Sequence, residues 1–268
     1  MKTKYTLLVI ISWFFTVSLL AQTVNESVVV SSGGGPSAGG IYSNFAVVGE
    51  PFVASPVAGS TISTNIGFIY RTADIQATIV NLTIFLEGLY AGSGVMNKAQ
   101  NELGDQFNGT VADKITFELH NAITYATTAY TNSNVDLNTN GTATVSVPSG
   151  VSGSYYVTVK HRNSIETVSK NPINFAGTPL SYNFSTDFTQ AFGDNLKHLG
   201  EGIYGLYAGD INGDGAVDAL DMIPLENDAA GFVTGYINTD VNGDGSIDAL
   251  DMILVDNNSA AFISAITP

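Results

Sequence analysis

Two segments near the C-terminus of the chain repeat one another at a fixed offset of 30 residues. The first runs from Asp210 to Asp221 and the second from Asp240 to Asp251. Nine of the twelve positions are identical, and Met-Ile follows both copies. A repeat of this kind indicates a unit that folds twice and packs against its own copy. It constrains the last quarter of the chain more than any other feature.

The spacing of oxygen-bearing side chains within each copy indicates a calcium loop. Ca²⁺ takes roughly six to eight oxygen ligands, which a tight loop supplies from positions 1, 3, 5, 7, 9 and 12. Position 6 must turn sharply, and both copies have glycine there, Gly215 and Gly245, because glycine accepts a positive φ at little cost. Position 7 gives its backbone carbonyl, and position 9 binds directly or through water. The predicted ligands of two Ca²⁺ ions are Asp210, Asn212, Asp214, Ala216, Asp218 and Asp221, and Asp240, Asn242, Asp244, Ser246, Asp248 and Asp251.

Other metals fit these loops less well. Mg²⁺ prefers a near-ideal octahedron and keeps its waters, and transition metals favour His or Cys, which the loops lack. The apolar residues at position 8, Val217 and Ile247, are expected to point into a core that the two loops share.

The charge of the chain also favours divalent cations. The formal net charge is −15, and from Glu201 onward there are 12 Asp and Glu but no Lys or Arg. A packed module of this composition repels itself unless something neutralises it. The acidity argues against nucleic acid and anionic membrane surfaces as partners.

The duplicated loops resemble the type I dockerin family, in which each of two repeats is a calcium loop followed by one helix. Asp rather than Glu at position 12 is the dockerin habit, and no amphipathic helix pattern precedes either loop. The resemblance covers about 60 residues and implies a cohesin partner. The chain departs from the family at Pro224, inside or at the start of the first helix, and it lacks the basic residues that dockerins often use to hold cohesin.

Two dipeptides occupy matching positions just after the loops, Ala219-Leu220 and Ala249-Leu250. The resemblance to dockerins implies that these dipeptides are candidates for recognising the cohesin partner. The alternative is that Leu220 and Leu250 belong to the core of the module.

The N-terminus reads as a secretory signal peptide at residues 1–21. Lys2 and Lys4 precede an apolar run, and the run ends in small residues at Ala21. The run is short for a membrane span, so we expect cleavage, secretion and no membrane insertion afterwards. Without the signal, seven Lys and Arg face 24 Asp and Glu, a net charge of −17.

The middle of the chain predicts antiparallel β-structure. Four segments alternate apolar and polar residues: 82–86, 115–120, 143–147 and 155–161. Their apolar sets are Leu82, Ile84 and Leu86; Ile115, Phe117 and Leu119; Ala143, Val145 and Val147; Tyr155, Val157 and Val159. Turn signals at 108–109, 140–141 and 148–150 separate the strands. We expect a mainly β fold, an immunoglobulin-like or transthyretin-like β-sandwich followed by a small α module of dockerin type.

The predicted domains are the signal at 1–21, a Gly/Ser-rich β-hairpin segment at 22–75, the sandwich at 76–200 and the dockerin-like calcium-binding domain at 202–268. A short helix is also expected at 97–103. No Cys is present, so burial, metal or both, and not disulfides, must stabilise the secreted chain.

No catalytic constellation stands out, and we expect a protein that is not an enzyme. Of the three histidines, His161 is expected on the apolar side of its strand and His120 on the strand surface, and neither these nor His198 show metal spacing. Glycosidases need two facing carboxylates. Glu50, Glu87, Glu118 and Glu166 exist, but the sequence does not pair them.

A sugar-binding sandwich would need exposed aromatic rings. Tyr156 is expected to share the outward side of its strand with Lys160 and Arg162, as a glycan platform or as ordinary surface packing.

The preferred hypothesis is a secreted bacterial protein, extracellular or at the cell surface. Its dockerin-like module attaches it to a cohesin-like domain or a cell-surface scaffold, in the setting of extracellular polysaccharide degradation. One alternative is a carbohydrate-binding protein or adhesin in which calcium only stabilises the fold. A further alternative is a glycoside hydrolase within the sandwich.

Overall fold

The computed structural model describes residues 37–39, 42–44, 77–176 and 179–268. The chain divides into two compact units, Met1–Ile75 and Gln76–Pro268. In the first unit, strands β1 (Ser37–Gly39) and β2 (Tyr42–Asn44) form an antiparallel pair. The predicted signal at 1–21 and most of segment 22–75, including Glu50, lie outside the described residues.

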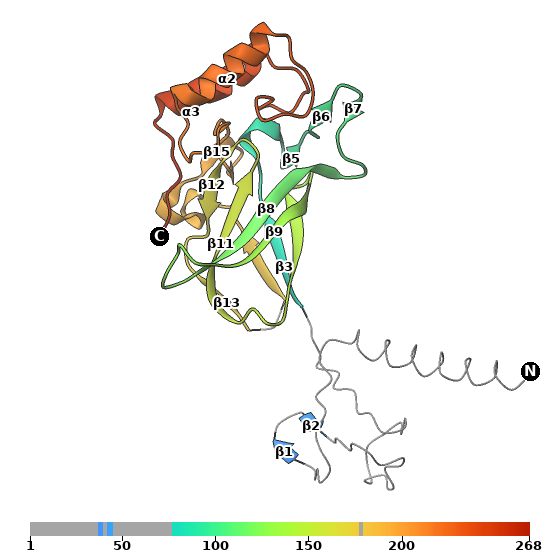
Figure 1. Ribbon diagram of the computed structural model, residues 1–268, viewed down its shortest axis with the longest axis vertical. Coiled ribbons are helices and arrows are strands. Elements are labelled where there is room, and N and C mark those ends of the chain that lie inside the picture. Colours follow the sequence, from blue (N-terminus) through green and yellow to red (C-terminus); the bar gives the residue numbers. More distant parts are fainter. Residues whose placement is uncertain (1–36, 40–41, 45–76, 177–178) are drawn as a thin grey trace, which may run out of the picture. The chain divides into compact units, whose positions relative to one another are not determined.

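The second unit is built on one eight-stranded sheet (Figure 1). Its hydrogen-bonded path runs β12, β11, β8, β9, β10, β3, β14, and β13 pairs with β11. All neighbours are antiparallel except β14 and β3, which run parallel. The strands are β3 (Thr78–Thr83), β8 (Val111–Asn121), β9 (Thr128–Asn138), β10 (Thr142–Val147), β11 (Gly153–His161), β12 (Ser164–Val168), β13 (Ile173–Phe175) and β14 (Leu180–Asn183).

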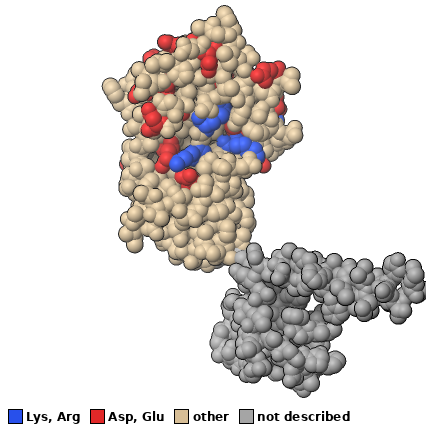
Figure 2. Space-filling model, viewed as in Figure 1, with Lys and Arg blue, Asp and Glu red and all other residues tan. Residues whose placement is uncertain are grey.

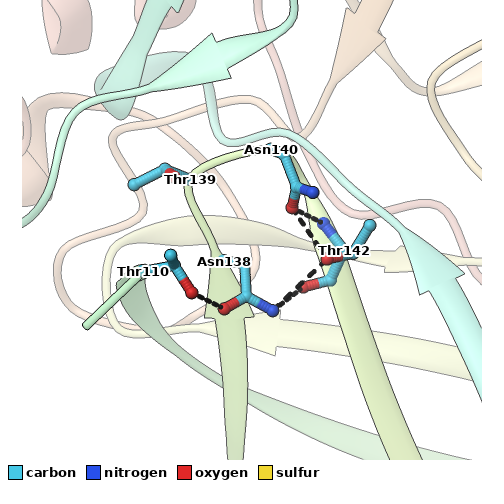
Figure 3. Close-up of a pocket in the computed structure, with 5 residues that line it drawn as sticks. All are labelled: Thr110, Asn138, Thr139, Asn140 and Thr142. Atoms are coloured by element: carbon cyan, nitrogen blue, oxygen red, sulfur yellow. Dashed lines mark hydrogen bonds between the residues drawn. The ribbon is translucent and has the colours of Figure 1, made fainter. Parts of the chain in front are cut away.

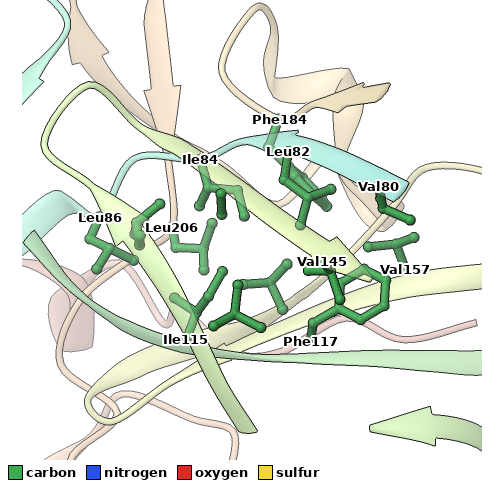
Figure 4. Close-up of a cluster of buried hydrophobic side chains, with 14 of the residues drawn as sticks. Val80, Leu82, Ile84, Leu86, Ile115, Phe117, Val145, Val157, Phe184 and Leu206 are labelled. Carbon is green, nitrogen blue, oxygen red and sulfur yellow. The ribbon is translucent and has the colours of Figure 1, made fainter. Parts of the chain in front are cut away.

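The period-two patterns in the sequence correspond to the buried face of this sheet. The sheet curls so that residues of β3 and β10 meet residues of β8 and β11 in one core (Figure 4). All the apolar residues predicted to face inward are buried, except Tyr155, which is half-buried. Their burial supplies the hydrophobic stabilisation that a chain without disulfides requires.

One turn of the sheet depends on glycine. Gly141 joins β9 to β10 with φ 79°, and a Cβ there would come within 2.9 Å of the carbonyl oxygen of Ile84. Only glycine satisfies both the left-handed backbone and the close approach.

The second unit also contains several short elements outside the large sheet. They are η1 (Glu87–Leu89), the hairpin β4–β5 (Tyr90–Gly92, Val95–Met96), the hairpin β6–β7 (Gln100–Asn101, Gly104–Asp105), η2 (Phe188–Gln190), η3 (Phe192–Asp194) and the hairpin β15–β16 (Lys197–Gly200, Ile203–Gly205). The prediction of a short helix at 97–103 is wrong. The segment forms β6 and its turn, because Gln100 and Asn101 pair with β7 and Gln100 N also donates to the carbonyl of Gly243.

The C-terminal module consists of two loop–helix repeats. Helix α2 (Ala219–Ala230) follows the first loop and α3 (Ala249–Ala260) the second. Each begins in a capping box formed by Asp218 and Asp221 or by Asp248 and Asp251. Pro224 lies inside α2, where it leaves one helical hydrogen bond unmade.

The core of the module includes a residue of the β-sheet. Val217 and Ile247 are buried together with Leu225 and Val255 of the helices, as their position in the loops predicted, and Ile165 of β12 belongs to the same cluster. The mainly β fold with two helices in the C-terminal module is confirmed. In the described part of the chain, no helix is long and apolar enough to cross a membrane.

Candidate functional site

The two loops fold by the same local hydrogen bonds. In the first, Asn212 Oδ1 accepts from Asp214 N at 2.7 Å, and Asp214 Oδ1 accepts from Ala216 N at 3.0 Å. In the second, the equivalent bonds are 2.8 and 2.9 Å. Asx turns of this kind wind the chain so that alternate side chains lie inside the loop.

The position-12 carboxylates close the loops. Asp221, which is fully buried, accepts from the backbone N–H groups of Ile211 and Asn212 at 2.8 and 3.0 Å, and from Asp218 N at 2.9 Å. Asp251 makes the same three bonds in the second loop. Each carboxylate therefore ties the start of its loop to the start of its helix.

The position-9 residues serve as helix N-caps. Asp218 Oδ1 accepts from Leu220 N and Asp248 Oδ1 from Leu250 N, both at 2.7 Å. A carboxylate at this place also stabilises the positive end of the helix dipole. The capping role alone accounts for aspartate here, and metal binding at position 9 stays a prediction.

The position-1 carboxylates are buried without enough partners. Oδ1 of Asp210 and both oxygens of Asp240 have no hydrogen-bond partner. Burial raises the pKa of Asp210 to about 6, and the neighbouring Asp221 adds to the shift. Burial raises the pKa of Asp240 to about 7, although Arg162 opposes it. An unpaired buried carboxylate is costly, and a bound divalent cation is one group that could satisfy such oxygens.

The donor set of each loop is mixed. Among the residues that the structure describes, no three His, Cys, Asp or Glu side chains group as a metal site. The loops instead combine carboxylates with an asparagine and a backbone carbonyl, and such oxygen-only, mixed sets suit Ca²⁺ better than Zn²⁺.

The helices present matched apolar residues to solvent. Leu220 and Leu250 are each 56% exposed, and Ile223 and Ile253, three residues further on, are 55% and 54% exposed. The alternative that the two leucines belong to the core is therefore wrong. Spacing of three residues places each leucine beside its isoleucine on one helix face.

A second matched pair was missed by the sequence reasoning. Phe232 and Phe262 directly follow the helix caps, are 89% and 90% exposed, and have φ of 51° and 55°. Glycine is the usual residue in this left-handed conformation at a helix end. The signal was present in the sequence, because the two phenylalanines have the same 30-residue offset as the loops.

Acidic residues are frequent in the part of the molecule that carries the two helices. On the face shown in Figure 2, Asp and Glu gather over the part where Figure 1 places α2 and α3. The described residues from 77 to 207, which precede the module, are called the β-sheet unit below. Two of their cations reach the module: Arg162 lies 3.8 Å from Asp240, and Lys197 Nζ contacts Asn258 Oδ1 at 3.0 Å. The β-sheet unit thus supplies part of the counter-charge that the module lacks.

The histidines have structural partners. His120 was expected on the strand surface, but it is only 7% exposed, because Glu118 and the carbonyl of Tyr125 each share a hydrogen bond with its ring and Tyr125 stacks on it. The side chain of His161 is buried, as expected, and contacts Asp113. His198 packs against Tyr204.

Two of the carboxylates that the sequence did not pair come together around a lysine. Lys160 Nζ lies 2.9 Å from Glu118 and 3.2 Å from Glu166. Burial acts to raise the pKa of Glu118, but hydrogen bonds from His120 and Lys160 outweigh it and lower the pKa. A glycosidase acid requires the opposite shift. Glu87 lies in a different network, with Lys197 and Asn258.

The possible glycan platform is not flat. Tyr156 is half-buried and meets Tyr125 and Phe192 edge to face. Arg162 was expected beside Tyr156 and Lys160, but its side chain instead enters the module, where its Nη1 donates to the carbonyls of Ile237 and Asp240.

A hollow of about 340 Å³ lies at the β9–β10 turn (Figure 3). It is lined by uncharged residues, Thr110, Asn138, Thr139, Asn140 and Thr142. Asn138, Asn140 and the two threonines Thr110 and Thr142 already bond to one another, so the hollow offers few unpaired polar groups to a ligand.

Comparison with protein families addresses the module directly. Residues 208–258 match the model of the dockerin type I domain. The dockerin region thus spans both loops, α2 and most of α3. Dockerin type I domains generally bind calcium, and proteins that contain them are typically extracellular or at the cell surface. The domain is a non-catalytic module and does not by itself define the activity of the rest of the chain.

Solved structures add two weak similarities. Both are interface mutants of a type II cohesin–X–dockerin complex from Acetivibrio cellulolyticus, one altered at the C-terminal and one at the N-terminal interface. Each is 16% identical over 69% of this chain and 99% of the other, with TM-scores of 0.39 and 0.36. No curated protein matches the chain.

Proposed function

We propose that this is a secreted, non-catalytic protein whose dockerin region binds two Ca²⁺ ions and attaches the chain to a cohesin-type domain. The observation that carries the proposal is the matched exposure of Leu220 with Ile223 and of Leu250 with Ile253 within the dockerin region. Exposure of the same apolar residues on both repeats favours a surface for a partner over the chance exposure of single apolar side chains.

Calcium is assigned to the two loops. Positions 1, 3, 5, 7, 9 and 12 of each loop are the proposed ligands, and the unpaired buried oxygens of Asp210 and Asp240 support this assignment. Bound calcium supplies positive charge inside a region that has no Lys or Arg of its own. The chain's own residues hold the loops in shape, through Asp221 and Asp251, and orient the helices that carry the exposed side chains.

The partner surface follows from the same residues. Each helix offers an exposed leucine and isoleucine within a region that has many carboxylates and no Lys or Arg, so the partner requires an apolar patch with basic groups at its edge. Cohesin is proposed as this partner because of the family match. A role in polysaccharide degradation follows from the resemblance alone.

The alternatives have less support. A glycan platform needs an open ring face, and Tyr156 packs against its neighbours edge to face. A glycoside hydrolase needs a free acid, and Glu118 and Glu166 both contact Lys160.

The test uses the chain without its predicted signal, residues 22–268, and a panel of type I and type II cohesin domains. Isothermal titration in calcium should give binding to at least one cohesin, and chelation should abolish it. The double variant Leu220→Arg/Leu250→Arg should weaken binding at least about 100-fold, because it charges both apolar surfaces. Ile123→Arg is the control, since Ile123 is 95% exposed but lies on the β-sheet unit. Failure to bind any cohesin in calcium would contradict the proposed partner.

A further inference from the structure

The two loops have the same side chains at the proposed ligand positions other than position 7, but the β-sheet unit holds only one of them by an ionic contact. Arg162, in the turn between β11 and β12, lies with Nη2 3.8 Å from Oδ2 of Asp240, position 1 of the second loop. Its Nη1 donates to the carbonyl of Asp240 at 2.8 Å and to that of Ile237. The first-loop counterpart, Asp210, forms no ion pair within the described residues.

The position of Arg162 is itself determined by a buried carboxylate. Asp113 of β8 is fully buried and accepts from Arg162 Nε at 3.3 Å and from the hydroxyl of Tyr236 at 2.5 Å. The ring of Tyr236 packs under the guanidinium, 4.6 Å from its centre to Cζ. With this much restraint, the guanidinium loses little entropy when it contacts the loop.

Asn163, the next residue in the turn, holds the backbone on both sides. Its Nδ2 donates to the carbonyls of Asn238 and Asp240 at 3.0 and 2.9 Å. Its own carbonyl accepts from Gly209 N at 2.7 Å, just before the first loop. The first loop is thus fastened at its entry, whereas the second is fastened at position 1 itself.

The second loop also rests directly on the β-sheet unit. A Cβ at Gly88 of η1 would overlap the carbonyl oxygen of Val241, and a Cβ at Gly243 would overlap the side chain of Leu89. Gly213 is the first-loop counterpart of Gly243 and has almost the same φ, 73° against 74°, yet nothing lies within 4 Å of its Cβ position. The first loop instead pairs with the C-terminal segment, where Val217 N donates to Ile263 and Ala265 N to Gly215.

From these contacts we infer that Arg162 is a positioning residue that keeps the second loop folded before calcium binds, so that the two calcium sites are not equivalent. The β-sheet unit preforms the second loop, because Arg162 binds the carbonyl of Asp240 and offsets part of the cost of its buried carboxylate, and because Gly88 and Leu89 pack against the loop. The first loop has neither the ionic contact nor this packing against the β-sheet unit, and it orders when calcium binds. The inference rests on calcium binding as proposed above, but its main observable is measured without calcium.

Hydrogen–deuterium exchange of residues 22–268 in chelator tests it. The backbone amides of Val241 and Asn242, which donate to Asp251, should exchange at least about tenfold more slowly than those of Ile211 and Asn212, which donate to Asp221. In Arg162→Gln this difference should disappear. Lys160→Gln is the control, since the ion pairs of Lys160 are with Glu118 and Glu166 and not with a residue of either loop. Equal exchange of both loops in the wild type would overturn the inference.

A pair of glycine variants keeps the test decisive if Arg162→Gln does not fold. Gly213→Ala and Gly243→Ala carry the same backbone strain, and only the second collides with Leu89. Gly243→Ala should speed exchange in the second loop, whereas Gly213→Ala should leave the second loop unchanged. If the second loop exchanges alike in both variants, the inference is wrong. If added calcium protects neither loop of the wild type, the calcium assignment fails, while the difference measured in chelator still stands.

Discussion

Glu87 Oε2 accepts a hydrogen bond from Asn258 Nδ2 at 2.6 Å and thereby joins η1 of the β-sheet unit to helix α3 of the dockerin region. Asn258 is fully buried and also donates to the carbonyl of Ala208, while Lys197 bridges Asn258 and Glu87. The contact spans 171 positions of sequence. The dockerin region is therefore packed onto the rest of the unit by polar groups as well as by Ile165.

Asn258→Ala should destabilise the protein by about 2–3 kcal/mol, because it leaves the carboxylate of Glu87 with fewer partners and the carbonyl of Ala208 unpaired. Urea unfolding of residues 22–268 measures the loss. Asn257→Ala is the matched control, since Asn257 is exposed and should change the free energy of unfolding by less than about 0.5 kcal/mol. Equal effects of the two variants would mean that this network contributes nothing specific.

Calcium should stabilise the protein strongly. At about 1 mM calcium and a dissociation constant of roughly 1–10 µM, each site contributes roughly 3–4 kcal/mol. Chelation should lower the melting temperature of the wild type, and Asp210→Ala/Asp240→Ala should reproduce that lowering in the presence of calcium. If the double variant melts like the wild type in calcium, the ligand assignment is wrong.

Stability should fall in acid through Asp113. Burial acts to raise the pKa of Asp113, but His161, Arg162 and Tyr236 outweigh it and lower the pKa to about 2. A carboxyl with a lowered pKa in the folded state stabilises the protein above its unfolded pKa near 3.8 and loses this contribution as pH falls toward about 2.

The shift corresponds to roughly 2 kcal/mol. Asp113→Asn should therefore cost about that much at pH 7, with the difference shrinking as the pH approaches about 2. Calcium-free urea unfolding across this range is the measurement. Asp136→Asn, at an exposed residue paired with Lys114, should show almost no such dependence. A pH-independent loss in Asp113→Asn would point to lost packing rather than lost charge.

Phe232 and Phe262 should matter for binding and not for stability. A left-handed backbone costs a non-glycine residue about 1 kcal/mol or more, so Phe232→Gly/Phe262→Gly should leave the melting temperature unchanged or slightly raised. If these exposed rings contact the partner, the same variant should bind cohesin about tenfold more weakly. A clear drop in melting temperature would show that the rings contribute to the fold instead.

The parts of this protein that the sequence predicted depend on neighbours along the chain. Alternation places Ile115, Phe117 and Leu119 on one face of β8, because successive strand residues point to opposite sides. Asx turns and a glycine at position 6 are also local, so both loops could be read from residue spacing. The inward direction of Val217 and Ile247 followed from their place in the repeat.

Other features depended on contacts that no local pattern contains. The sequence placed His120 on the strand surface, although it is buried, and left open whether Leu220 is exposed or part of the core, since both are decided by how strands and helices pack. The direction of Arg162 is the clearest case: alternation placed it beside Lys160, but Asp113 and Asp240, 49 and 78 positions away, draw it into the dockerin region. Short-range spacing thus determined which elements and loops form. Only the tertiary structure decided which of two similar loops the β-sheet unit holds by an ionic contact, because a charge interacts with whatever the fold brings within a few ångströms, regardless of sequence distance.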